Sequence, residues 1–398
     1  MKLSISNGTS FRILVALSVA HCLNDLLQSV LSASYPILKN DLSLSFRQIG
    51  LITLVYQLAA SVFQPVIGYY FDKRPSARSL PTGIAFSLCG LLSLAFADSL
   101  PWVMCSVFMH GLGSSIFHPE ASRLTSLAAG GKRGFAQSLF QVGGNFGSAV
   151  GPLLVALVVA PYTRHNIAFL GILAIIAFMV IMPISRWYKE RLQYIISQRN
   201  AAASANVQRP LSLRLTVCSI VILMMLIFSK YIYMASLSSY YTFYLIEKFD
   251  VTVQNSQVLL FVFLIATAIG TMLGGPLGDR IGRKYVIWFS ILGAAPFALA
   301  MPHLGLFWTV ATSFCTGLIL SSAFPAILVY AQELLPYKLG MVSGLFYGFS
   351  FGVAGIASAV LGRMADIHGI EAVYNVCAYM PLIGLITYFL PNLKRKNK

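Results

Sequence analysis

Charged residues are scarce in this sequence: they make up 10% of its 398 residues, whereas 57% of the residues are hydrophobic. About a quarter of the residues of a soluble globular protein are charged, so that class is excluded. The six cysteines stand singly within apolar stretches, without the paired spacing of a disulfide framework or a metal site. The loops also lack a phosphate-binding loop, a nucleophile–base motif and a cluster of metal ligands. We therefore expect a membrane protein that is not an enzyme and that uses no cofactor or metal.

Acidic residues are scarcer than basic ones, because 12 Asp and Glu stand against 28 Lys and Arg and give a net charge of +16. A basic balance of this kind is also found in nucleic-acid-binding proteins. Here the basic residues lie in short clusters between apolar runs, which is the pattern of loops retained on the cytoplasmic side of a membrane. We expect the lipid bilayer, and no nucleic acid, as a partner.

Twelve apolar segments, in two sets of six, are each long enough to form a membrane-spanning helix. They lie at about 12–34, 48–71, 79–97, 101–128, 134–160 and 166–188, and at about 214–246, 255–278, 284–302, 306–334, 340–364 and 370–390. At about 1.5 Å per residue, roughly 20 residues cross the hydrocarbon core, and open sheets are excluded by their unpaired edges. The sequence predicts an all-α membrane protein with six-helix bundles at 1–188 and 214–398, joined by a cytoplasmic linker at 189–213.

The Lys and Arg residues near the ends of these segments fall mainly on one side of the membrane. About 21 of them lie in one set of alternate loops and the basic tail, and about five lie in the other set. Because basic loops are retained in the cytoplasm, we expect both termini there.

A repeat relates the two sets of helices. The pattern Gly68-x-x-x-Asp72-Lys73 recurs 207 residues later as Gly275-x-x-x-Asp279-Arg280, and Pro119 is matched by Pro325 at an offset of 206. Landmarks at nearly the same offset indicate an internal duplication. We expect two pseudo-symmetric halves in the same orientation, with a central cavity near the midplane.

The second copy of this pattern resembles the signature loop of the major facilitator superfamily of secondary transporters. It runs Gly275-Pro-Leu-Gly278-Asp279-Arg280-Ile-Gly282-Arg283-Lys284. The resemblance implies a cytoplasmic gating motif formed by Gly68, Asp72, Lys73, Gly275, Asp279, Arg280, Gly282 and Arg283, in which the aspartates take arginines or helix N-termini as partners. The first copy departs from the pattern at Pro75 and Ser76, so we expect its latch to be weaker or to use Arg78.

Within the superfamily, the sequence resembles the bacterial fosmidomycin resistance group. The resemblance rests on Phe117-His118-Pro119-Glu120, Gln137-Ser-Leu-Phe-Gln141-Val-Gly143-Gly144-Asn145-Phe-Gly147, Ser229-Lys230-Tyr231 and Tyr330-Ala-Gln332-Glu333-Leu-Leu-Pro336. It implies a monomer in the bacterial inner membrane that exports a small toxic compound by alternating access, with the proton gradient as energy source. The alternatives are a symporter of the same fold that imports a sugar or organic acid, and a non-transporting membrane receptor.

The fifth apolar segment has small residues four apart, at Gly143, Gly147, Gly151 and Pro152. This stripe resembles the antiporter motif of drug exporters, although Val155 and Ala156 replace its final glycines. Close helix packing without any directional meaning is the alternative interpretation.

Ionisable residues inside the membrane are costly and are therefore functional candidates. Asp25 lies on a polar stripe with Ser18, His21, Gln28 and Ser32, and Glu120 follows His118 three residues before Arg123. We expect Asp25, Glu120 and His118 to couple transport to protons. The alternatives are a permanently satisfied Asp25 carboxylate and a structural pair of Glu120 with Arg123.

Lys230 stands alone in an apolar segment and needs a carboxylate or an anionic substrate as partner. We expect a substrate site for a small anion or zwitterion, formed by Lys230, Tyr231, Tyr233, Gln141, Asn145, Arg123 and His21. The alternative is a standing ion pair between Lys230 and Asp25.

Overall fold

The computed structural model describes residues 9–44, 46–159, 161–204 and 211–393 of the chain, apart from the side chains of a few helical residues. Within these ranges the chain is helical and contains no strand. The prediction of an all-α protein is confirmed.

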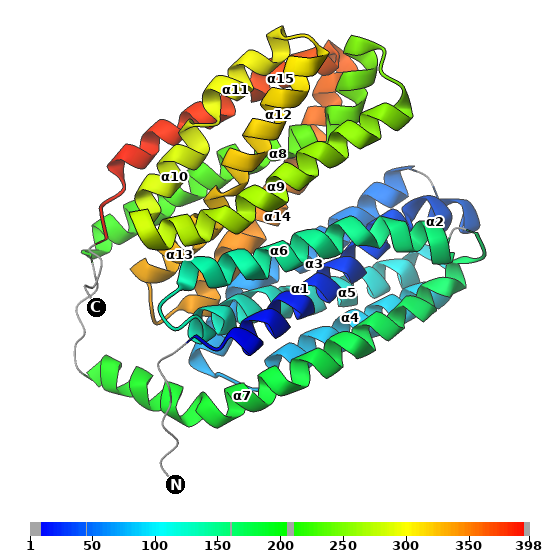
Figure 1. Cartoon of the computed structure of the whole chain (residues 1–398). Helices are drawn as coiled ribbons and strands as arrows, with labels where there is room; N and C mark the ends of the chain where they lie inside the picture. The colour runs from blue at the N-terminus through cyan, green and yellow to red at the C-terminus, as the bar shows by residue number, and fades with distance from the viewer. Residues whose placement is uncertain (1–8, 45, 160, 205–210, 394–398) are drawn as a thin grey trace. The chain divides into compact units, whose positions relative to one another are not determined.

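In the described part of the chain, seven α-helices begin before the expected linker and eight begin at its end or after it (Figure 1). The first seven are α1 (Phe11–Ala33), α2 (Tyr35–Asp41), α3 (Phe46–Lys73), α4 (Ser79–Phe96), α5 (Leu100–Ala128), α6 (Arg133–Leu154) and α7 (Gly171–Ser204). The others are α8 (Leu213–Phe249), α9 (Val253–Ile281), α10 (Arg283–Leu292), α11 (Ala295–Ala300), α12 (Leu306–Ser321), α13 (Ala323–Leu334), α14 (Leu339–His368) and α15 (Ile370–Cys377).

Eleven spans in the described part of the chain are long and apolar enough to cross a membrane. The segment expected at 134–160 is not among them. It corresponds to α6 and a π turn at Val155–Val159. Glycines and the amide side chains of Gln141 and Asn145 make α6 less apolar than those eleven spans.

Several expected single helices are divided or extended. The segment at 284–302 is α10 followed by α11, the segment at 306–334 is α12 followed by α13, and α15 continues as a 3₁₀ helix at Met380–Phe389. Pro296 and Pro325 lie in the first turns after two of these breaks, where a missing N–H is tolerated. Helix α7 extends to Ser204, so the expected linker is helical over 189–204, and its residues 205–210 lie outside the described part of the chain.

The chain forms two compact units, which are described separately below. Unit 1 comprises Met1–Val207 and Leu335–Gly348, and unit 2 comprises Gln208–Leu334 and Phe349–Lys398. Helix α14 therefore contributes its first turns to unit 1 and the rest to unit 2. The expected boundaries at 188 and 214 stay a prediction.

In unit 1, α1 lies directly against α6 (Figure 1). The glycines of α6 make this approach possible: a Cβ atom on Gly143 would lie 2.1 Å from the carbonyl oxygen of Ser18, and one on Gly147 would lie 1.9 Å from that of Cys22. Gly151 similarly faces Ser29. The stripe thus lets α1 pack closely against α6. The side chain of Pro152, the last member of the expected motif, lies outside the described residues.

Candidate functional site

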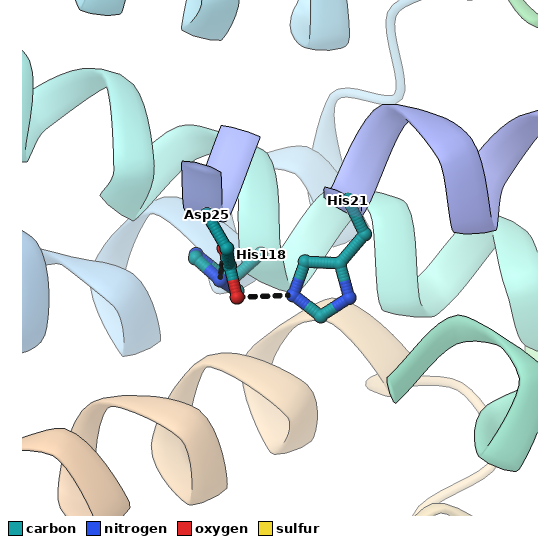
Figure 2. Close-up of side chains that lie close together, drawn as sticks. All are labelled: His21, Asp25 and His118. Carbon is teal, nitrogen blue, oxygen red and sulfur yellow. Dashed lines mark hydrogen bonds and ion pairs between the residues drawn. The ribbon is translucent and has the colours of Figure 1, made fainter. Parts of the chain in front are cut away.

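A buried cluster of three ionisable side chains lies within unit 1 (Figure 2). Asp25 of α1 stands between His21, one helical turn earlier, and His118 of α5. The Nε2 atom of His21 is 3.2 Å from Asp25 Oδ2, and the Nε2 atom of His118 is 3.2 Å from Asp25 Oδ1. The two histidines are 1% and 0% exposed, and Asp25 is 9% exposed. The structure therefore brings two of the expected proton-coupling residues together and adds His21 to them.

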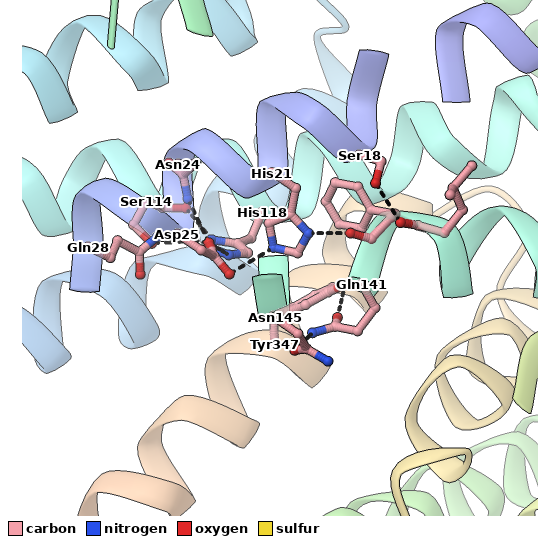
Figure 3. Close-up of polar contacts among 12 residues, drawn as sticks. Ser18, His21, Asn24, Asp25, Gln28, Ser114, His118, Gln141, Asn145 and Tyr347 are labelled. Carbon is pink, nitrogen blue, oxygen red and sulfur yellow. Dashed lines mark hydrogen bonds and ion pairs between the residues drawn. The ribbon is translucent and has the colours of Figure 1, made fainter. Parts of the chain in front are cut away.

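Two amide side chains also donate to one oxygen of this carboxylate (Figure 3). Asn24 Nδ2 lies 3.0 Å and Gln28 Nε2 lies 3.4 Å from Asp25 Oδ1. Tyr56 of α3 in turn donates its hydroxyl to Gln28 Oε1 over 2.7 Å. The polar stripe expected on α1 is thus a hydrogen-bonded network that links α1, α3 and α5.

Backbone carbonyl groups orient both imidazole rings. His21 Nδ1 lies 2.7 Å from the carbonyl oxygen of Phe140, and His118 Nδ1 lies 3.0 Å from that of Ser114. The ring of His21 also stacks on the ring of Phe140, with centroids 4.0 Å apart. Each Nε2 atom is therefore directed at the carboxylate.

The same three residues are candidates for holding a metal ion. Their ligand atoms all lie within 4.8 Å of one another. Two histidines and one carboxylate are a common ligand set for divalent transition metals. The expectation that the protein uses no metal stays a prediction.

Glu120 lies in a second buried cluster of unit 1. Arg123 donates from Nε to Glu120 Oε2 over 3.0 Å and from an Nη atom to Glu120 Oε1 over 2.5 Å. The same Nη atom lies 2.5 Å from the hydroxyl oxygen of Tyr188 of α7. Glu120 and Arg123 are 1% and 4% exposed. The geometry is that of a bidentate ion pair joining α5 to α7, so the pairing of Glu120 with Arg123 expected from their spacing is present.

The amide residues of α6 form a third group, close to the first turns of α14 (Figure 3). Gln141 Nε2 donates to Asn145 Oδ1 over 3.2 Å, and Tyr347 donates its hydroxyl to Gln141 Oε1 over 2.9 Å. The Tyr347 ring centroid is 5.4 Å from that of His118. Gln141 and Asn145 are thus linked to the Asp25 cluster through Tyr347.

Lys230 of α8 lies in unit 2 and is 5% exposed. Its Nζ atom is 5.0 Å from the ring centroid of Tyr231 and 5.3 Å from that of Phe324. Among the described residues of unit 2, it has no hydrogen bond or ion pair. Tyr233 is 1% exposed in the interior of the same unit, and no hydrogen bond joins it to Lys230 in the described part of the chain.

Within unit 2, the residues of the second signature loop bond to one another and to Glu333. Arg283 donates to Asp279 Oδ1 over 2.7 Å and to the carbonyl oxygen of Gly278 over 2.8 Å, and its Nε atom lies 3.2 Å from Glu333 Oε1. Gly282 joins α9 to α10 with φ +104°, a conformation that side chains disfavour. Gly275 is buried within α9 and Arg280 is exposed.

The first copy uses a helix N-terminus. Asp72 accepts hydrogen bonds from the backbone N–H groups of Gly340 (3.0 Å) and Met341 (2.8 Å), in the first turn of α14. A carboxylate at this end of a helix also meets the positive end of its dipole. Gly68 leaves room for the approach, because a Cβ atom there would lie 2.1 Å from the carbonyl oxygen of Gly340. Lys73 is exposed, with its Nζ atom 4.5 Å from the Tyr69 ring centroid.

Several partners in these clusters were not expected from the sequence. They are Asn24, Gly144, Tyr188, Phe324, Tyr347 and the carbonyl oxygens of Ser114 and Phe140. Carbonyl oxygens leave no signal in a sequence, and an aromatic residue in an apolar segment is indistinguishable from ordinary core.

Ionisable clusters buried inside apolar, membrane-spanning helices are typical of membrane transporters. The family model of the Major Facilitator Superfamily matches residues 17–259 and 220–398, and the chain belongs to this family. It is 53% identical to the fosmidomycin resistance protein of Escherichia coli (strain K12) over 389 residues, which cover 98% of this chain and 95% of that protein. It is also 40% identical to the uncharacterized MFS-type transporter YfnC of Bacillus subtilis (strain 168), over 96% of this chain and 94% of that protein.

Solved structures of the same fold agree with this assignment. A proton:xylose symporter, XylE, matches with a TM-score of 0.75 at 15% identity, over 96% of each chain. The human organic anion transporter MFSD10 matches with a TM-score of 0.75 at 13% identity, over 96% of this chain and 99% of that one. At these identities the likeness concerns the fold alone. Together with the family match, it shows a multi-pass transporter of small molecules.

Proposed function

We propose that this protein exports a small toxic anion of the fosmidomycin type from the cytoplasm in exchange for protons. The observation that carries the substrate class is the 53% identity, over 98% of the chain, to a fosmidomycin resistance protein. Transporters of this superfamily work by alternating access, with substrate bound near the midplane of the membrane. The same mechanism is proposed here.

The Asp25 cluster supports proton coupling. A carboxylate in contact with two imidazoles can gain and lose a proton inside the membrane, where a fixed charge would be costly. Glu120 already has a bidentate partner in Arg123. We therefore assign coupling to Asp25 and its histidines, and a structural role to Glu120 and Arg123.

Lys230 supplies the contact with the anion in this proposal. A buried ammonium without a counter-ion is unfavourable, and a phosphonate would provide the missing negative charge. The rings of Tyr231 and Phe324 stabilise the cation while the site is empty.

The proposed setting is the bacterial inner membrane, with a monomer whose two termini face the cytoplasm. The charge distribution supports this orientation, because about 21 Lys and Arg lie on the side of the termini. The proton gradient serves as the only energy source, without a cofactor.

Resistance and transport measurements test the proposal together. Expression in a sensitive strain should raise the tolerated concentration of fosmidomycin, and purified protein in proteoliposomes should accumulate it against its gradient when a pH gradient is imposed. Asp25→Asn should abolish this accumulation but still exchange fosmidomycin across the membrane at equal pH. Lys230→Met should lose binding while its melting temperature rises, because an unpaired buried charge has been removed.

Three results would contradict the proposal. If a protein with both Asp25→Asn and Glu120→Gln still transports substrate in response to a pH gradient as the wild type does, coupling at these carboxylates is excluded. Substrate moving in the same direction as protons would indicate an importer of the same fold. A stoichiometric plateau of bound substrate without exchange would indicate a receptor.

A further inference from the structure

We propose that His21, Asp25 and His118 form a binding site for a divalent transition-metal ion such as Zn²⁺. The ligand atoms are Nε2 of each imidazole and the carboxylate oxygens, and they lie within 4.8 Å of one another (Figure 2). The ion is an additional ligand of the protein, and the export proposed above does not require it. The inference therefore goes beyond the proposed function and is tested without substrate.

Both rings direct the lone pair that a metal ion needs at the same carboxylate. Nδ1 of His21 lies 2.7 Å from the carbonyl oxygen of Phe140, and Nδ1 of His118 lies 3.0 Å from that of Ser114. A carbonyl oxygen can only accept a hydrogen bond, so each neutral ring has its hydrogen on Nδ1 and its lone pair on Nε2. The hydroxyl oxygen of Ser114, 3.2 Å from His118 Nδ1, can accept the same hydrogen. The two histidines thus share one tautomer.

Two lone pairs that face a carboxylate are unfavourable unless a cation joins them. Nε2 of His21 is 3.2 Å from Asp25 Oδ2, and Nε2 of His118 is 3.2 Å from Asp25 Oδ1. The Nε2 atom of His21 is buried and has no hydrogen bond among the described residues. A metal ion accepts lone pairs from all three side chains at once, so it satisfies both contacts together.

The distances and the ligand types fit a small transition-metal ion. Zinc bonds of about 2.0–2.2 Å at tetrahedral angles separate neighbouring ligand atoms by about 3.3–3.6 Å. The two nitrogen–oxygen distances of 3.2 Å are close to this range. Mg²⁺ and Ca²⁺ prefer oxygen ligands, whereas imidazole suits Zn²⁺ and its neighbours in the periodic table. The site therefore selects a transition metal.

Groups behind the three ligands hold them in place. Histidines that bind a metal usually donate their other ring nitrogen to a carbonyl or carboxylate, as both rings do here. The ring of His21 also stacks on that of Phe140, with centroids 4.0 Å apart. Asn24 and Gln28 donate to Asp25 Oδ1 over 3.0 and 3.4 Å (Figure 3). Because these partners already fix the ligands, binding an ion costs little conformational entropy.

The site has an accessible side. A Cβ atom on Gly144 would lie 2.6 Å from both His21 Nε2 and Asp25 Oδ2, so the missing side chain leaves these two atoms uncovered by α6. Asp25 is 9% exposed, whereas the histidines are 1% and 0% exposed, so an ion enters past the carboxylate. Zinc sites with three protein ligands keep a further position for a small ligand. An anion is favoured there, because Zn²⁺ and Asp25 together leave one positive charge inside the membrane.

No sequence motif marks this site. His21 and Asp25 lie about one helical turn apart on α1, and His118 follows 93 residues after Asp25, on α5. Metal-binding motifs are recognised by closely spaced ligands. The sequence therefore predicts no metal, and the ligand set is formed only by the packing of α1 against α5.

Zinc binding to the purified full-length protein in detergent tests the proposal. The protein is prepared without a histidine tag, treated with a chelator and titrated with ZnCl₂ in a calorimeter. We expect one Zn²⁺ per chain, and no binding of Mg²⁺ at the same concentration. His21→Gln and His118→Gln should each weaken Zn²⁺ binding by at least ~10-fold, because each removes a ligand.

His110→Gln is the matched control for these substitutions. His110 is also buried in α5, and its Nδ1 atom lies 3.0 Å from a carbonyl oxygen, that of Ser87. It does not belong to the group of three ligands. The His110→Gln protein should therefore bind Zn²⁺ as tightly as the wild type.

X-ray absorption at the zinc edge identifies the ligands in the wild-type protein, so the test does not depend on the folding of any variant. We expect two imidazoles together with oxygen ligands at about 2.0–2.2 Å, and no sulfur at about 2.3 Å. A spectrum with fewer than two imidazoles would overturn the proposal, as would a wild-type protein without saturable Zn²⁺ binding. Unchanged affinity in both His21→Gln and His118→Gln would place the ion elsewhere and overturn it too. None of these measurements involves transport, so a failure here is distinct from a failure of the proposed export.

Discussion

Glu120 and Asp25 are both carboxylates buried in unit 1, but their partners differ. Glu120 faces the permanently charged Arg123, whereas Asp25 faces histidines, which can be neutral or charged. A pair of opposite fixed charges satisfies both members and resists protonation. A carboxylate between histidines can exchange a proton at small cost, so the identity of the partner separates the structural group from the functional one.

Replacing Glu120 by glutamine tests this distinction. The substitution leaves the Arg123 guanidinium buried without its counter-charge, which should destabilise the protein by about 3–5 kcal/mol. Thermal unfolding of the purified protein in detergent measures the effect. Tyr188→Phe serves as the matched control: it removes only the hydroxyl acceptor of Arg123, at a cost of about 1–2 kcal/mol. A Glu120→Gln protein as stable as wild type but unable to use a pH gradient would identify Glu120 as the proton carrier.

At the scale of single residues, the sequence identifies the ionisable residues inside the spans, but it does not identify the role of each. Asp25, Glu120, His118 and Lys230 stand out because a charge in an apolar segment is rare. Whether such a residue is paired depends on side chains and carbonyl groups from distant parts of the chain. The partner of His21 Nδ1 is the carbonyl oxygen of Phe140, 119 residues away, and no sequence pattern encodes that contact.

At the scale of helices, the glycines of α6 act as a packing surface for α1. Three of them approach backbone or side-chain oxygens of α1 so closely that a methyl group would overlap. The spacing of four residues predicted a packing stripe but not which helix it meets. The same holds for the divided helices: proline positions indicate where a break is tolerated, but whether the helix breaks depends on its neighbours.

Gly147→Ala tests the packing of α1 on α6. The added Cβ atom would lie 1.9 Å from the backbone oxygen of Cys22, which cannot rotate away, so the helices must separate. We expect a loss of about 1–3 kcal/mol in the free energy of unfolding, measured by thermal unfolding. Gly352→Ala in α14 is the matched control, because no atom lies within 4 Å of the new Cβ. It should be neutral or stabilising, since alanine favours a helix by about 0.5–1 kcal/mol over glycine. Equal effects of the two substitutions would show that the stripe has no packing role.

At the scale of the whole molecule, the net charge of +16 has a physical cause other than an acidic partner. Lys and Arg that flank membrane spans determine which loops stay in the cytoplasm. The few charges inside the spans do not contribute to this bias and are paired or surrounded by aromatic rings. Orientation and mechanism thus depend on separate sets of charged residues.

Reporter fusions test the orientation directly. Alkaline phosphatase fused after His368 or at the end of the chain, and inserted at Tyr162 between α6 and α7, reports which side each position occupies. Helix α7 starts from a loop with few basic residues, and the tail after Pro391 is rich in them, so we expect phosphatase activity at Tyr162 and none at the C-terminus. His368 precedes α15 on the poorly charged side, and a fusion there should be active. An active C-terminal fusion with an inactive one at Tyr162 would reverse the orientation. Export from the cytoplasm would then require protons to reach Asp25 along the opposite path.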